Sequence, residues 1–133
     1  MAERYPHLLP HERRIWKRFV DNPPFPIDRA EYDVRLGEGM PINPEWPPAI
    51  QHMARVLTQK RVDVIVQSGS EWWLIEIKRR AGFSALGQLL GYAILWIDKY
   101  PARPSPRLAV VCESLQPDLV GVLAQYSIAV FLV

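Results

Sequence analysis

The chain has 133 residues, of which 16 are basic and 14 acidic, and its formal net charge is +2. This length suits one domain and is too short for two, and the charge balance alone does not indicate nucleic-acid binding. A single cysteine, Cys112, excludes an internal disulfide bond and any multi-cysteine zinc or iron–sulfur site.

The sequence shows no sign of membrane insertion or secretion. Its longest apolar run, near residues 127–133, is far too short to span a bilayer, and residues 1–6 contain no apolar signal-peptide segment. We therefore expect an intracellular, cytoplasmic protein without membrane contact, in the cytoplasm of the host cell if the protein is viral.

The first third of the chain is rich in proline, with nine of the 13 prolines in residues 1–48. Apolar residues at helical spacing, after a proline suited to a first helical turn, predict a helix over 10–20. Strict alternation predicts a strand over 31–36, and residues 37–50 are interpreted as a surface loop. We expect a single domain over 1–133, with a proline-rich part over 1–50 and a core over 54–133.

From about residue 54, short apolar runs alternate with turn residues and amphipathic segments. Strands are predicted at 61–66, 72–78, 108–112 and 128–132, and helices at 84–99 and 117–125. The apolar stripe expected to face the core on the first of these helices consists of Leu86, Leu90, Ala93, Ile94 and Ile97. The order α-β-β-β-α-β-α-β predicts an α/β (α+β) fold with a mixed sheet, because an antiparallel hairpin precedes a right-handed βαβ unit.

The hairpin over 61–78 has a register that follows from its turn. With Gly69 and Ser70 as the two loop residues, facing residue numbers sum to 139, so Asp63 lies opposite Glu76. One face of the hairpin is then expected to be buried, formed by Val62, Val64, Val66, Trp73, Ile75 and Ile77. The other face carries Asp63, Glu76 and Lys78, because residues two apart in a strand point the same way.

Facing carboxylates repel each other and need compensation. One interpretation is an ion-pair quartet in which Lys78 pairs with Asp63 and Arg61 pairs with Glu76. The other is a divalent metal ion, which prefers hard oxygen ligands. The next helix places Gln88 and Tyr92 one turn apart, either as solvated side chains or as residues that return toward the carboxylates.

The pattern of Asp63, the tripeptide Glu76-Ile77-Lys78, then Gln88 and Tyr92 resembles the PD-(D/E)XK nuclease superfamily. The Gln-x-x-x-Tyr element is most similar to RecB-like members of the superfamily. The resemblance implies a restriction-endonuclease-like αβββαβ core with an extra carboxyl-terminal α-β. Valine rather than proline precedes the aspartate here, and the lone cysteine excludes the iron–sulfur subgroup.

The resemblance also implies roles for these residues. Asp63 and Glu76, with the backbone carbonyl of Ile77, would bind Mg²⁺ or Mn²⁺, and Lys78 would orient the attacking water. Gln88 and Tyr92 complete the expected catalytic set.

A further metal ligand is expected from the first helix, where Glu12 is the candidate. The same residue would also be favoured there by the helix dipole alone. Asp33 and Glu38 are weaker candidates for this role. Basic residues near the carboxylates are expected to contact DNA phosphates: Arg13, Arg14, Lys17, Arg61, Arg79 and Arg80.

The sequence thus predicts a Mg²⁺-dependent deoxyribonuclease that hydrolyses phosphodiester bonds through metal-activated water. One alternative is a catalytically silent subunit with a nuclease fold, used for DNA docking or structural assembly in a viral or recombination complex. Another is a dimeric resolvase that cuts branched DNA of the Holliday-junction type. DNA is the expected partner, together with a homodimer contact and a protein partner that supplies specificity.

Overall fold

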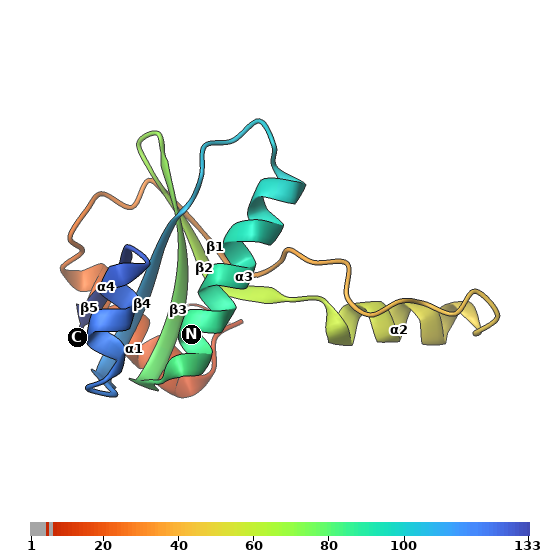
Figure 1. Cartoon of the computed structure of the whole chain (residues 1–133), viewed down its shortest axis with the longest axis horizontal. Helices are drawn as coiled ribbons and strands as arrows, with labels where there is room; N and C mark the ends of the chain where they lie inside the picture. The colour runs from red at the N-terminus through yellow and green to blue at the C-terminus, as the bar shows by residue number, and fades with distance from the viewer. Residues whose placement is uncertain (1–4, 6) are drawn as a thin grey trace, which may run out of the picture.

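The computed structural model describes Tyr5 and residues 7–133, apart from the side chains of residues 56 and 57. Five strands form one mixed sheet in the order β1-β2-β3-β4-β5 (Figure 1). The strands are β1 (Arg29–Arg35), β2 (Arg61–Ser68), β3 (Glu71–Ala81), β4 (Arg107–Leu115) and β5 (Ile128–Leu132). The first three are antiparallel neighbours, and β3, β4 and β5 are parallel. The predicted fold class and mixed sheet are confirmed.

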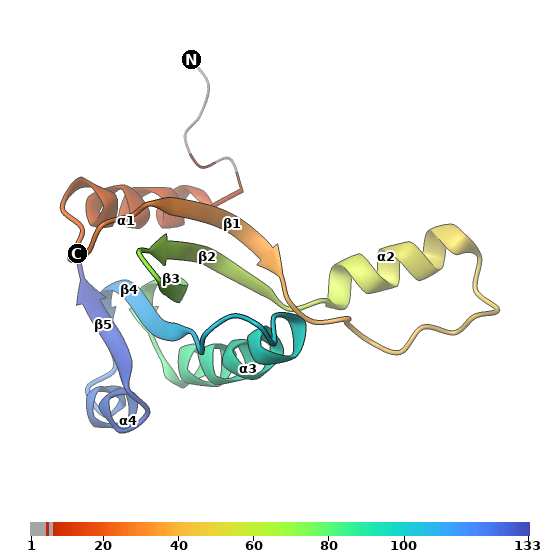
Figure 2. The ribbon, with the colours of Figure 1, turned by 90° about the horizontal axis from the view of Figure 1, so that it is seen from above.

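Four helices accompany the sheet, namely α1 (Pro10–Asp21), α2 (Pro48–Thr58), α3 (Phe83–Lys99) and α4 (Leu119–Gln125). Figure 2 shows α1 on one face of the sheet and α3 and α4 on the other. Each face buries its own apolar cluster, which we call the α1-side cluster and the α3-side cluster. No helix in the described part of the chain is long and apolar enough to cross a membrane, and residues 1–4 and 6, on which the absence of a signal peptide was judged, lie outside that part.

The predicted hairpin register is confirmed where β2 and β3 pair regularly. Ser68 faces Glu71, and the pairing continues in the same register to Val64 and Ile75. Trp73 belongs to the α1-side cluster, whereas its neighbour Trp72 packs against the α3-side cluster. Adjacent side chains in a strand point to opposite faces, so Trp72 and Trp73 pack on opposite faces of the sheet.

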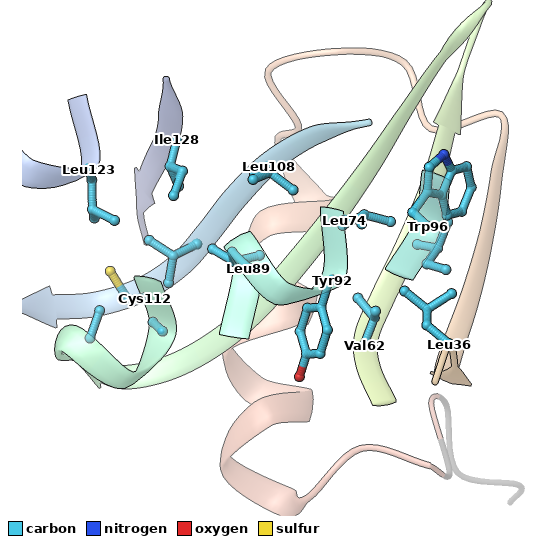
Figure 3. Packing of buried hydrophobic residues seen from close by; sticks show 14 of the residues in the cluster. Leu36, Val62, Leu74, Leu89, Tyr92, Trp96, Leu108, Cys112, Leu123 and Ile128 are labelled. Carbon is cyan, nitrogen blue, oxygen red and sulfur yellow. The ribbon is translucent and has the colours of Figure 1, made fainter. Parts of the chain in front are cut away.

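The prediction that Val62 shares a face with Val64 is wrong. Val64 packs in the α1-side cluster, but Val62 packs in the α3-side cluster (Figure 3). The pairing of β1 with β2 places Asp33 opposite Asp63, between these two valines. Asp33 has a left-handed backbone with φ of 52°, which turns the strand pair and exchanges its faces at this point.

The predicted core face of α3 is also wrong. The side chains that α3 buries against the sheet are Ala85, Leu89, Tyr92 and Trp96, while Leu86, Leu90 and Ala93 are only partly buried and Ile94 and Ile97 are exposed. This helix is apolar on nearly all sides, so periodicity alone cannot select the side that contacts the sheet.

The predicted order α-β-β-β-α-β-α-β lacks α2 altogether, and the interpretation of residues 37–50 as a loop includes the start of this helix. Residues 37–59 form an arm that leaves the sheet after β1 and returns to β2 (Figures 1 and 2). A hydrogen bond of 2.8 Å from the Leu36 amide to the Lys60 carbonyl closes the base of this arm. The arm therefore starts four residues after Asp33 on β1 and ends four residues before Asp63 on β2.

Candidate active site

The two facing carboxylates lie where the regular pairing of β2 and β3 ends. The Asp63 side chain does not point into solvent, because its Oδ2 atom accepts a 2.9 Å hydrogen bond from the Ile77 amide. Asp63 also shares a hydrogen bond with Glu76. The sequence-derived juxtaposition of Asp63 and Glu76 is thus present in the structure.

Glu76 is the one charged residue among the described residues that is fully buried, with a side chain only 3% exposed. Its Oε1 atom has no hydrogen-bond partner in the described structure. Burial, followed by repulsion from Asp63, raises the pKa of Glu76 to about 8. A buried carboxylate oxygen without a partner is costly, so this atom marks a place where a cation would be stabilising.

The pKa of Asp63 is raised as well. Burial raises the pKa of Asp63, although the hydrogen bond from Ile77 opposes this rise. Two buried acids that share a hydrogen bond retain a proton between them more readily than separate acids do. The pair is therefore poised to release that proton when a cation binds.

Lys78 and Tyr92 approach Glu76 from two elements. Lys78, on β3, places its Nζ atom 3.7 Å from Glu76 Oε2 and keeps 30% of its side chain exposed. Tyr92, on α3, has its ring in the α3-side cluster and its hydroxyl directed away from that cluster (Figure 3). Burial, followed by repulsion from the nearby carboxylates of Glu76 and Asp63, raises the pKa of Tyr92 well above its usual range.

Gln88 lies one turn before Tyr92, and both line a cavity of about 250 Å³. The cavity also has walls from Lys60, Gly91 and Leu95, and Gln88 Oε1 is buried without a hydrogen-bond partner in the described structure. The expectation that Tyr92 returns toward the carboxylates agrees with its proximity to Glu76, whereas for Gln88 the expectation stays a prediction. Lys60 was missed by the sequence analysis, because it precedes the strand and belongs to no motif.

Glu12 has a capping role and also lies near the carboxylates. Its Oε1 atom accepts a 2.8 Å hydrogen bond from the Leu9 amide at the start of α1. Burial raises the pKa of Glu12, and Asp63 contributes to this rise by repulsion. Repulsion from Asp33 likewise raises the pKa of Asp63. Asp33 lies near Asp63 because of the register between β1 and β2, which the sequence does not reveal.

The expected ion-pair quartet takes a different form. Arg61 NH1 lies 3.1 Å from Asp33 Oδ2 on β1, and Lys78 pairs with Glu76 rather than with Asp63. The diagonal pairing predicted from the hairpin is therefore wrong, because β1 supplies a third acidic residue beside it. Arg61 is held at the edge of the site by this contact.

The other basic residues fall into two groups. Arg13, Arg14 and Lys17 line one cavity of about 220 Å³ on α1 together with Tyr5, and Lys17 also pairs with Asp21 at 2.8 Å. Arg79 and Arg80 follow Lys78 on β3 and are exposed. Both groups lie on elements that carry or flank the carboxylates.

The donor set suits a small, hard cation. Within the described part of the chain, no three Asp, Glu, His or Cys side chains lie close enough together to hold a metal ion by themselves. Mg²⁺ commonly uses one or two carboxylates and completes its coordination with water and substrate phosphate. Asp63 and the unpartnered oxygen of Glu76 fit that requirement, and the site chemistry does not favour zinc, which prefers nitrogen and sulfur ligands.

Comparisons with known proteins bear on the fold. No family model and no curated protein matches this sequence. Among solved structures, the chain is similar to a repair endonuclease from Pyrococcus abyssi, with a TM-score of 0.55 and 18% identity over 99% of this chain and 49% of that one.

The chain is also similar to EndoMS in a complex with double-stranded DNA and in its apo form. The TM-score is 0.56 for both, with 18% and 17% identity over 99% of this chain and 48% of theirs. The chain thus spans about half the length of these structures. At such identities the likeness concerns the fold, so the chain has the mixed α/β fold that these repair endonucleases contain.

Proposed function

We propose that this chain is a metal-dependent deoxyribonuclease of the PD-(D/E)XK superfamily, closest to the RecB-like branch. The observation that carries the proposal is the buried Glu76 carboxyl, whose Oε1 atom has no hydrogen-bond partner among the described residues and whose neighbours are Asp63, Lys78 and Tyr92. A buried acid pair beside a lysine stabilises the fold poorly, since it costs desolvation energy. A catalytic role accounts for that cost.

The bound ion would be Mg²⁺ or Mn²⁺, held by Asp63, Glu76 and the carbonyl oxygen of Ile77. When bound, such an ion lowers the pKa of a coordinated water and polarises the phosphate oxygens. Lys78 orients the attacking water and stabilises its deprotonated form. Tyr92 lies beside Glu76 and would help to position it, and the two carboxyls would have to be free of protons to hold the ion.

DNA binding in this proposal relies on phosphate contacts from the two basic groups. Arg79 and Arg80 would contact the strand beside the scissile phosphate, and Arg13, Arg14 and Lys17 would contact DNA along α1. Such contacts position the DNA without reading its sequence. The solved complex of EndoMS with double-stranded DNA, a protein of similar fold, supports the proposal that DNA is the substrate.

The experiment that tests the proposal is a cleavage assay on labelled linear, nicked, flapped and four-way DNA. Each substrate is incubated with the protein in Mg²⁺, in Mn²⁺ or in a chelator. We expect cleavage of at least one form with either metal and none with the chelator. A folded protein that binds DNA but cleaves no form in either metal would overturn the nuclease proposal and favour the DNA-docking subunit.

A further inference from the structure

The arm, residues 37–59, is held together through the polar side of α2. Gln51 Nε2 donates hydrogen bonds to the carbonyls of Trp46 and Pro44, at 2.7 and 3.2 Å, and the Met40 amide donates to Thr58 Oγ1 at 2.7 Å. The loop also approaches α2 closely at Gly39, where φ is +85° and a Cβ atom would lie 2.4 Å from Thr58 Oγ1. The loop therefore covers the polar side of α2.

The apolar side of α2 faces outward as a result. Ile50 and Met53 are one turn apart, and both are about half exposed, as is Met40 in the loop. An amphipathic helix normally turns its apolar side to the core. Figures 1 and 2 show α2 projecting beyond the sheet, away from α1, α3 and α4. We call Ile50 and Met53 the arm face.

A second apolar surface lies on the outer side of α3. Ile94 is 64% exposed, and Ile97 and Phe83 are about half exposed, on the side opposite the residues that pack on the sheet. We call Phe83, Ile94 and Ile97 the α3 face. Glycines at positions 87 and 91 lie beside it, and a Cβ atom added to either would meet no atom within 4 Å. This surface is therefore open to a close approach by another helix.

We propose that two copies of this chain form a two-fold dimer in which the arm face of each copy packs on the α3 face of the other. Figure 2 shows the arm projecting past the end of the sheet, whereas the residues of the α3 face lie on the side of α3 opposite its contacts with the sheet. A two-fold axis makes every contact occur twice, so a single symmetry operation covers both apolar surfaces of both copies.

The exposed area favours a second copy that uses both faces. Half-exposed Ile, Met and Phe side chains each offer roughly 100 Å², so the arm face offers roughly 200 Å² of apolar surface and the α3 face roughly 300 Å². A stable interface buries about 800 Å² per partner, of which somewhat more than half is apolar. One face alone falls short of that, whereas the two faces together, with a polar rim, reach it.

The dimer is tested by sedimentation velocity of the full chain over a range of concentrations. We expect the wild type to sediment at twice the monomer mass of 15.3 kDa. Met53→Glu on the arm and Ile94→Glu on α3 each place a charge in both copies of the contact and raise the dissociation constant about 100-fold or more. Val120→Glu is the matched control, since Val120 on α4 is 54% exposed and belongs to neither face.

Mixing the two variants distinguishes this arrangement from an arm-to-arm contact. In a mixed dimer, the intact arm of the Ile94→Glu chain meets the intact α3 face of the Met53→Glu chain, so one of the two contacts is restored. We expect the equimolar mixture to associate more tightly than either variant alone and less tightly than the wild type. A monomeric wild type, dimers that survive both substitutions, or a mixture that associates no more tightly than either variant alone would each overturn the proposal, whatever the protein does to DNA.

Discussion

The amide of Ile77 donates a 2.9 Å hydrogen bond to the carboxylate of Asp63. This contact fastens the side chain of one strand to the backbone of the next at the point where their regular pairing ends. It also places Asp63 beside Glu76 and leaves one oxygen of Glu76 without a partner in the described structure. The local geometry of the proposed metal site therefore arises from the hairpin itself.

The metal-free protein should lose stability as the pH rises. Folding raises the pKa of Glu76 from 4.5 to about 8, so the folded state holds a proton that the unfolded state releases. This contribution is complete below pH 4.5 and disappears as the pH rises through about 8. Urea denaturation in a chelator should show a loss in the free energy of unfolding on the order of 5 kcal/mol over this range.

The isosteric variant Glu76→Gln is the control for this pH dependence, because it cannot ionise. Its stability curve should be flatter than that of the wild type between pH 5 and pH 8. Parallel curves for the two proteins would show that Glu76 ionises in the folded state as it does in the unfolded one.

Divalent cations should stabilise the wild type. Binding to the folded state alone adds about 2.7 kcal/mol when the ion is at 100 times its Kd, and this corresponds to a rise in Tm of about 5–10 °C for a chain of this size. In Asp63→Asn the rise should largely vanish. Asp98→Asn, an exposed change on α3, should keep it, and equal stabilisation of all three proteins would argue against the proposed ligands.

Alanine variants of Lys78 and Arg80 should have different effects on cleavage and on DNA binding. Lys78→Ala removes the group 3.7 Å from Glu76, so cleavage should be lost while the affinity for DNA changes little. Arg80→Ala removes an exposed cation and should weaken binding and reduce the salt dependence by about one phosphate contact. Fluorescence anisotropy and cleavage rates measure the two effects, and identical losses in both variants would assign Lys78 to binding alone.

Asp33 should tolerate glycine better than alanine, although glycine usually weakens a strand. Its φ of 52° lies in the left-handed region, which costs a residue with a Cβ atom about 1–2 kcal/mol and costs glycine little. Both variants lose the pair with Arg61, so this loss cancels in the comparison. Equal free energies of unfolding for the two variants would show that the backbone at Asp33 is unstrained.

Much of the fold could be predicted because the local sequence patterns specify the same strands and turns that the sheet contains. The alternation of 61–66 and the turn at Gly69 specify the hairpin register, and this register brings Asp63 to Glu76. The exchange of faces at Val62 could not be foreseen, because it depends on Asp33 in a strand that is distant in sequence.

The two errors in helices have a common physical origin. Periodicity identifies an apolar side but does not say what covers it. On α3 the side that carries Ile94 is apolar although it faces away from the sheet and is exposed. On α2, Ile50 and Met53 are exposed because this helix lies on an arm that does not pack against the sheet. The dimer proposed here accounts for both, because it covers these surfaces with a second copy rather than with the core.

The most direct test of the central claim is the single-turnover rate of DNA cleavage in Mn²⁺ for the wild type and Glu76→Gln. The variant keeps the shape of the side chain and removes the charge that would hold the ion. The account predicts a fall of about 1,000-fold with DNA affinity retained, and an unchanged rate for Glu113→Gln, whose carboxylate pairs with Arg18 on the surface. Cleavage by Glu76→Gln at the wild-type rate would contradict the account.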